Sequence, residues 1–301
     1  MPGMKTNPIP EYPKGLVLWI IINHTKFDTI LGVEEYEYRE GAEVDENKIK
    51  DALEKFYIDL RIWKDMTLHE IKKKLLDIKN EANSGPNKFA GLVIMGMSHG
   101  EQINGVDMLV TKDCELLSTE FIKEIFHNCN CPGFQNKPKA FLFNMCRGSG
   151  KNINLTKKLE TSKSICNDAL SSSIHQRASK CDFDPESIEF KKGDYLIAHS
   201  TISGFVSNRH RRFGSIFVQE ITKAINQYMG KGQNHFEEVV RIACSSSSWH
   251  QYSGEKAPQL PEYTTTLRAH FKFVLKSKQF YNKFLYFLLV LIIKLYLVNH
   301  L

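Results

Sequence analysis

The sequence lacks three features that would have placed it in a familiar class. It has no regular cysteine spacing, no apolar leader after Met1 and no internal repeat. Its seven cysteines are an odd number at irregular intervals, which favours free thiols in a reducing, cytoplasmic compartment over a secreted disulfide framework. The excess of one charge sign is also small, since 40 Lys and Arg against 34 Asp and Glu leave a net charge of +6. Without a recognisable nucleic-acid module, this excess argues against a nucleic-acid partner.

The chain has 301 residues, of which 42% are hydrophobic. This is enough for one or two domains with a buried core, and it excludes disordered, collagen-like and mini-protein classes. Apolar runs rich in β-branched residues predict buried strands at 16–22, 91–97, 140–143 and 195–198, with a last strand at 265–275.

Apolar residues at helical spacing lie between these runs. They predict three helical faces and a further helix at 235–243. The second face opens with Thr67 and Glu70 at the spacing of a capping box. Strands that alternate with helices predict an α/β fold, a mostly parallel sheet with helices on both faces. The faces are Ile49, Leu53, Phe56 and Tyr57; Leu68, Ile71, Leu75 and Ile78; and Phe217, Ile221, Ala224, Ile225 and Tyr228.

Two segments interrupt this alternation. Residues 149–190 are rich in Ser, Lys, Asn and Asp and are interpreted as a linker between two parts of one sheet. Residues 284–298 are apolar except for Lys294, and as a helix they would reach about 22 Å, short of a ~30 Å hydrocarbon core. Membrane association through residues 280–298 is therefore one hypothesis. An extra packed helix and an atypical tail are the others.

Two predicted strands end in residues that could perform chemistry. One runs into Ser98, His99 and Gly100, and the other into the segment 144–148, which contains Cys146. A cysteine nucleophile needs a base and backbone N–H groups that stabilise the oxyanion, and His99 and Cys146 could supply them. Taken singly, each has a structural explanation, as a buried small hydrophobe or a satisfied histidine.

A second group of residues suggests a metal. His127, Cys129 and Cys131 lie close together, with Cys114 nearby in the sequence. The Cys-x-Cys spacing has no matching second pair, so it does not reach the usual zinc pattern. We predict no metal and no cofactor.

The segment 144–148, Asn-Met-Cys-Arg-Gly, resembles the Gln-Ala-Cys-Arg-Gly signature of the caspases, which also carry a histidine about 50 residues upstream. Caspases are cysteine endopeptidases that cleave after aspartate. Further similarity occurs at 18–27, 39–45, 193–200 and 204–209, so the resemblance extends over roughly residues 14–275. It implies the caspase-like α/β fold, a mostly parallel six-stranded sheet with helices on both faces.

The resemblance also implies roles for individual residues. Cys146 would be the nucleophile, His99 the acid and base, and the backbone N–H groups of Gly100 and Cys146 the oxyanion hole. Arg39 and Arg209 would hold the substrate aspartate, because guanidinium groups bind carboxylates in a forked geometry. The remaining substrate-binding residues would be Asn144, Ser207 and Asn208.

Four features depart from the family pattern. Asn144 stands where the family usually has Gln, and Met145 where it has Ala. Asn208 replaces the usual Trp, which removes an aromatic wall from a neighbouring subsite. The turn after Gly100 is also about two residues shorter than usual. Substrate recognition is therefore predicted to differ from the family pattern more than the nucleophile does.

The resemblance divides the chain into five parts: a short pro-segment (1–14), a large-subunit-like part (15–148), the linker (149–190), a small-subunit-like part (191–276) and a hydrophobic tail (277–301). The short pro-segment is typical of effector caspases. Within the linker, Asp168 is the best candidate for processing and Asp182 the second. Asp184 precedes Pro185, which makes it a poor site.

Two functional hypotheses follow from this resemblance. The first is an endopeptidase that cleaves proteins after aspartate in apoptosis-type signalling. The second is a weak or inactive caspase-like decoy that binds and regulates other caspases. The implied partners are protein substrates, a second caspase chain in a homodimer or heterodimer formed through the last strand, and inhibitor-of-apoptosis-type proteins.

Overall fold

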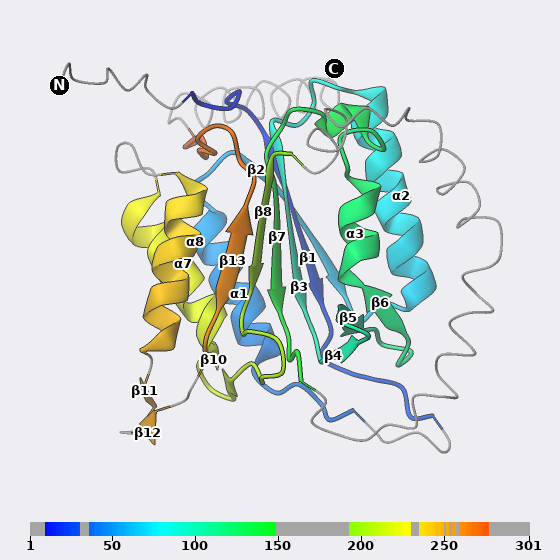
Figure 1. The fold of residues 1–301 in the computed structure, drawn as a ribbon, viewed down its shortest axis with the longest axis vertical. Coiled ribbons are helices and arrows are strands. Elements are labelled where there is room, and N and C mark those ends of the chain that lie inside the picture. The colour runs from blue at the N-terminus through cyan, green and yellow to red at the C-terminus, as the bar shows by residue number, and fades with distance from the viewer. Residues whose placement is uncertain are drawn as a thin grey trace, which may run out of the picture.

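The structure is a computed structural model, and it describes residues 10–30, 36–148, 193–229, 235–249, 251–252, 255–256 and 259–276. Within these residues the largest sheet has six strands (Figure 1). Their spatial order is β13 (Glu262–Thr265), β8 (Tyr195–His199), β7 (Lys139–Asn144), β3 (Gly91–Met97), β1 (Val17–Asn23) and β2 (Ile58–Lys64). Neighbouring strands are parallel except for β13, which runs antiparallel to β8. The predicted mostly parallel, six-stranded α/β fold is confirmed.

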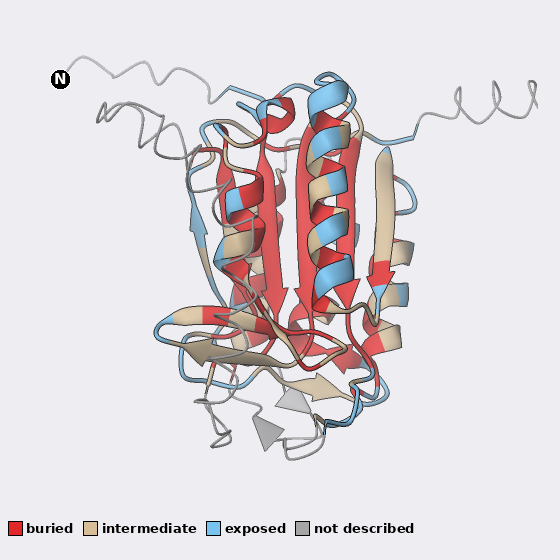
Figure 2. Ribbon diagram, turned by 90° about the vertical axis from the view of Figure 1, so that its right-hand side faces the viewer, coloured by how far each residue is buried: buried red, intermediate tan, exposed pale blue. Residues whose placement is uncertain are grey.

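Helices cover both faces of this sheet, as Figure 1 shows. One face carries α1 (Ala42–Leu53), α7 (Ile216–Tyr228) and α8 (Phe236–Ser248). The other carries α2 (Leu68–Ser84), α3 (Thr119–Ile125) and the short 3-10 helix η1 (Pro132–Phe134). The apolar residues of β1 alternate between the two cores, because successive side chains point to opposite faces. The central strands are therefore buried along their length (Figure 2), which explains their continuous apolar runs.

Helix α2 begins where the capping-box spacing predicts. The Thr67 side chain accepts a hydrogen bond from the backbone N–H of Glu70, and the Glu70 carboxylate accepts one from the backbone N–H of Thr67 at 2.8 Å. The predicted apolar positions of α2 are all buried against the sheet. Helix α1 is shorter than its predicted face, because it ends at Leu53, before Phe56 and Tyr57.

The predicted last strand at 265–275 is wrong in position. The strand that pairs with β8 is β13, which ends at Thr265, and the residues after it make only isolated bridges, at His270 and Leu275. Phe271 and Phe273 produced the strand-like pattern. Their rings instead fill the core beneath α8, where both contact Phe236 edge-on or tilted.

The carboxyl ends of the parallel strands lie together at one end of the sheet, towards the bottom of Figure 1. There Met97, the last residue of β3, is paired with Asn23 on one side and Asn144 on the other. A small antiparallel sheet lies beyond this end of the strands, and it is formed by β4 (Gly100–Ile103), β5 (Val106–Val110) and β6 (Leu116–Ser118). Two hairpins follow later in the chain: β9 (Arg209–His210) with β10 (Gly214–Ser215), and β11 (Gln251–Tyr252) with β12 (Glu255–Lys256).

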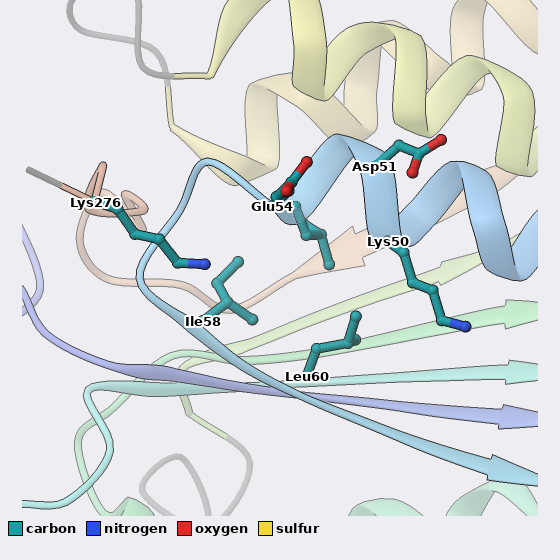
Figure 3. Close-up of a pocket in the computed structure, with 7 residues that line it drawn as sticks. Lys50, Asp51, Glu54, Ile58, Leu60 and Lys276 are labelled. Atoms are coloured by element: carbon teal, nitrogen blue, oxygen red, sulfur yellow. The ribbon is translucent and has the colours of Figure 1, made fainter. Parts of the chain in front are cut away.

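A hollow of about 350 Å³ lies at the opposite end of the sheet (Figure 3). Ile58 and Leu60 of β2 line it, and Ile58, at the start of β2, is paired with the first residue of β1. The figure shows charged side chains of α1 and Lys276 around it. The lining contains neither a thiol nor an imidazole, and it is Lys50, Asp51, Leu53, Glu54, Ile58, Leu60 and Lys276.

Some predictions fall on residues that the structure does not describe. These are the linker at 149–190 with Asp168 and Asp182, and the hydrophobic segment at 280–298. Among the helices that are described, none is both long and apolar enough to cross a bilayer.

Candidate active site

The structure brings His99 and Cys146 to neighbouring strand ends. Met97 and Asn144 are partners in the parallel pair of β3 and β7, so His99 and Cys146 each lie two residues beyond the same level. Gly100 packs directly against the loop that follows β7 and carries Cys146, here called the cysteine loop. A β-carbon on Gly100 would overlap the carbonyl oxygen of Cys146 and lie 2.8 Å from the side chain of Met145. Only glycine allows this close approach.

The ring of His99 is fixed by a backbone carbonyl. Its Nε2 lies 2.9 Å from the carbonyl oxygen of Glu37. Because a carbonyl oxygen can only accept, Nε2 carries the proton, and Nδ1 is the nitrogen that can accept one. Burial lowers the pKa of His99 to about 4, against the raising effect of the Glu37 bond, and Arg39 and Arg209 lower it further. The imidazole is therefore neutral at pH 7.

Cys146 is a half-buried free thiol. Its Sγ accepts a hydrogen bond from the backbone N–H of Ser207 at 3.4 Å, and the Ser207 hydroxyl donates to Oδ1 of Asn144 at 3.1 Å. The backbone of Arg147 also pairs with the same loop, through Gly204 and Phe205, at 2.9 Å each. The segment 203–209 is thus bonded to the residues on both sides of the thiol.

Two guanidinium groups lie beside the thiol. Nη1 of the buried Arg39 donates to the carbonyls of His24 and Met97, at 2.5 and 3.1 Å, and Nε of Arg209 donates to the carbonyl of Glu40 at 2.9 Å. Burial lowers the pKa of both groups, that of Arg39 to about 9, and a negative charge on the nearby Cys146 sulfur would raise both pKa values. Two partly desolvated cations this close together make a favourable site for a carboxylate.

Gly41 holds the segment of Arg39 against the hairpin of Arg209. Its φ of 87° lies in the left-handed region, and a β-carbon there would come within 2.6 Å of the carbonyl oxygen of Arg211. A side chain at this position would separate the two segments, and with them the two guanidinium groups.

Arg147 anchors the residue next to the thiol. Its guanidinium forms a forked pair with Asp107 on β5, with Nε–Oδ1 and Nη2–Oδ2 distances of 3.0 Å, and a further bond to Glu262 on β13. The Arg147 and Asp107 side chains are about nine-tenths buried. His199 lies 3.6 Å from the same carboxylate, and burial lowers its pKa to about 4.

Asn208 is held from the other side of the site. Its backbone N–H donates to Oε1 of Gln259 at 2.7 Å, and its carbonyl accepts from the N–H of Ile216 at 3.2 Å. The Gln259 side chain is buried, and its Nε2 has no partner among the residues that the structure describes. Gln259 therefore connects the loop that contains Asn208 to the segment that leads into β13.

The group of His127, Cys129 and Cys131 does not converge on a common point. Cys131 is buried, with its Sγ 3.5 Å from Oδ1 of Asn83, whereas Cys129 is exposed. In the described parts of the chain, no three His, Cys, Asp or Glu side chains are placed to hold a metal ion.

A family model for the Caspase domain matches residues 16–272, a region that contains every residue of this site. The chain belongs to the caspase family. It is 30% identical over 235 residues to Caspase-12 of Macaca mulatta, a match that covers 72% of this chain and half of that protein. It is 24% identical over 230 residues to Caspase-14 of Mus musculus, a match that covers 76% of this chain and 85% of that protein.

The fold is also that of a solved caspase. The crystal structure of Caspase-1 from Spodoptera frugiperda is similar with a TM-score of 0.64, at 20% sequence identity, over 92% of this chain and 97% of that one. The caspase fold predicted from the sequence is therefore confirmed.

The sequence-predicted site residues that the structure describes all lie around the carboxyl ends of the parallel strands. They are Arg39, His99, Gly100, Asn144, Cys146, Ser207, Asn208 and Arg209. Sequence reasoning missed Glu37, Asp107, Gln259 and the role of Arg147. Glu37 contributes a backbone carbonyl, so no side chain could have revealed it. The others are joined by bonds between residues far apart in the chain.

Proposed function

We propose that this caspase-family chain is a cysteine endopeptidase that cleaves proteins after aspartate. One observation carries the proposal: the thiol of Cys146 and a neutral His99 lie at neighbouring strand ends, with the guanidinium groups of Arg39 and Arg209 beside them. A thiol with a neutral imidazole suits acyl transfer, and paired guanidinium groups suit an aspartate next to the scissile bond.

The reaction follows from these positions. Cys146 Sγ attacks the scissile carbonyl carbon while its proton passes to Nδ1 of His99, because Nε2 is bound to the Glu37 carbonyl. The backbone N–H groups of Gly100 and Cys146 stabilise the oxyanion that forms. The imidazolium then protonates the leaving amine, and a water molecule hydrolyses the thioester with His99 as the base. A free thiol requires a reducing compartment, so we place the activity in the cytoplasm, in apoptosis-type signalling.

Substrate aspartate also tunes the base in this scheme. With the pocket empty, Arg39 and Arg209 disfavour an imidazolium at His99. A bound carboxylate would neutralise part of that charge and raise the pKa of His99 during the reaction. The imidazolium would thus be stabilised when it has to form, and peptides without aspartate would lack this help.

The assembly that we propose is a two-fold dimer formed through the exposed edge of β13, in place of the strand expected at 265–275. β13 is the outermost strand of the six-stranded sheet among the described residues, and an unpaired edge favours such pairing. Cleavage after Asp168 or Asp182 would separate the two parts of each chain.

The second candidate is a regulator that binds other caspases. It is favoured by Asn144 and Asn208, which depart from the family pattern within the pocket. The amide oxygen of Asn144 is bonded to Ser207, which leaves its NH₂ group as the donor for substrate. The N–H of Asn208 is occupied by Gln259.

One assay distinguishes the two candidates. The purified protein is incubated with a tetrapeptide reporter that ends in aspartate, with the matching asparagine peptide and the Cys146→Ala variant as controls. Turnover of the aspartate peptide alone, abolished in the variant, supports the peptidase. No turnover after cleavage of the linker, together with binding to a second caspase, supports the regulator.

A further inference from the structure

The imidazole of His99 is enclosed by two aromatic rings that come from an earlier part of the chain. The ring of Tyr36 stacks on it, with centroids 5.5 Å apart and planes at 28°. Phe27 approaches at 5.0 Å and 50°, and the Phe27 and Tyr36 rings also contact each other at 5.5 Å. This contact restricts rotation of the imidazole about its χ2 angle, which is otherwise broad.

Tyr36 is itself bonded to the residues that follow His99. Its hydroxyl donates to Oε1 of Glu101, on β4, two residues beyond the histidine. The next residue in the chain, Glu37, provides the carbonyl that binds Nε2. Two consecutive residues therefore hold the imidazole, one by its face and one by a nitrogen, and Glu101 fixes the first of them.

We propose that Tyr36 is a positioning residue for the reaction, which rests on the function proposed above. Its ring, held by the hydrogen bond to Glu101, keeps the His99 imidazole in the orientation in which Nε2 binds Glu37 and Nδ1 exchanges a proton with Cys146. Tyr36 acts by orienting His99, because its ring contacts the imidazole. The proposal requires no bond between Tyr36 and the substrate. A small angular error in such a base is expected to lower turnover strongly.

The same ring also affects the charge of the imidazole. Tyr36 and Cys146 face His99, and the charged groups that shift its pKa are Arg39 and Arg209, which disfavour the imidazolium, and the Glu37 carboxylate, which favours it. Burial is the largest influence and lowers the pKa of His99. Removing the Tyr36 ring would admit water to one face of the imidazole, so the pKa of His99 would rise towards its ordinary value.

The test uses variants that separate the ring from its hydroxyl. Tyr36→Leu removes the ring, Tyr36→Phe removes only the donor, and Glu101→Ala removes the acceptor. Tyr38→Phe is the matched control, because Tyr38 is 53% exposed and its hydroxyl bonds Glu43 at 3.2 Å, away from the histidine. The first measurement is kcat and KM on the aspartate peptide. The second is the rate at which iodoacetamide alkylates Cys146 at different pH values, read by mass spectrometry of the protein fragment that contains Cys146.

We expect Tyr36→Leu to lower kcat by about 10-fold or more with KM nearly unchanged, and to move the acid limb of Cys146 alkylation to higher pH by at least about half a unit. Tyr36→Phe and Glu101→Ala should each lower kcat by about 3-fold without moving the limb. Their double variant should lose no more than either one alone, because both remove the same bond. Tyr38→Phe should match the unmodified protein.

The proposal is overturned if Tyr36→Leu leaves both profiles unchanged, if the loss lies in KM alone, or if Tyr38→Phe loses as much. Additive losses in the double variant would also contradict it. Should Tyr36→Leu fail to fold, the pair Tyr36→Phe and Glu101→Ala decides. Alkylation reads the thiol and imidazole without peptide cleavage, so a protein that never turns over would contradict the proposed function and leave this test intact.

Discussion

Gly100 lies so close to Cys146 that a β-carbon on it would overlap the cysteine's carbonyl oxygen. The glycine therefore sets the distance between the loop after β3 and the loop after β7. Both backbone N–H groups of the proposed oxyanion hole belong to these two loops, so their separation decides whether the groups can act together.

The first prediction concerns this contact. Gly100→Ala should lower kcat by about 100-fold or more, because moving one loop removes an oxyanion donor from its place. Gly85→Ala is the control, since a β-carbon there meets nothing nearer than 3.5 Å. Kinetics on the aspartate peptide, with thermal unfolding of both variants, provide the measurement. An active Gly100→Ala variant would contradict the geometry of the oxyanion hole.

The second prediction concerns the carboxylate site. Arg209→Lys should lower kcat/KM on the aspartate peptide by about 30-fold or more, because an ammonium group cannot reproduce the fork of a guanidinium. Arg211→Lys, two residues away with a side chain that is 83% exposed, should stay within about 2-fold of the unmodified protein. Equal losses in the two variants would indicate general electrostatic attraction, and not a specific pocket.

The third prediction concerns the buried pair of Asp107 and Arg147. Asp107→Ala leaves the guanidinium with Glu262 as its remaining carboxylate partner in the described residues, so it should lower the free energy of unfolding by about 3 kcal/mol. Glu43→Ala removes an exposed pair with Lys64 and should cost under about 1 kcal/mol. Urea unfolding at pH 7 measures both. If the two costs agree, the buried pair does not stabilise the cysteine loop.

The fourth prediction concerns acid stability. His24 is fully buried, its ring nitrogens have no partner within the described residues, and burial lowers its pKa from 6.5 to about 4. Between these values the unfolded chain binds a proton that the folded chain does not, so stability falls as the pH is lowered. One such group changes the free energy of unfolding by about 1.4 kcal/mol per pH unit.

Replacing this histidine should therefore make stability less dependent on pH. The slope of the free energy of unfolding against pH, measured with urea between pH 4.5 and 6, should decrease by about one proton in His24→Leu. His69→Gln, at an exposed position on α2, serves as the control and should lack this decrease. An unchanged slope in His24→Leu would show that His24 is protonated in the folded protein.

The sequence predicted most of the fold because both faces of the central strands are covered. Such strands are continuous apolar runs, and those of β1, β3, β7 and β8 were found within a residue or two. Strand β2 was missed because it lies at the edge, where Asp59 and Arg61 interrupt the apolar pattern. The short elements α3 and β4 to β6 carry too few residues for a clear period.

The candidate site was predictable to a different extent. The positions of His99 and Cys146 at neighbouring strand ends could be predicted, because each follows a strong strand signal within a known motif. The carbonyl of Glu37 could not, because any residue supplies the same group. The bonds from Asp107 to Arg147 and from Gln259 to Asn208 join parts of the chain that are far apart, and no local pattern reports them.

Those two bonds have a common consequence at the border of the molecule. Arg147 also binds Glu262 on β13, and Gln259 lies three residues before Glu262. β13 and the segment before it are therefore connected both to the residue that follows Cys146 and to Asn208 in the proposed substrate site. A ligand or antibody fragment that displaced β13 would therefore disturb both parts of the proposed site at once. Chemical control of the protein could thus be sought at the outermost described strand, away from the proposed nucleophile.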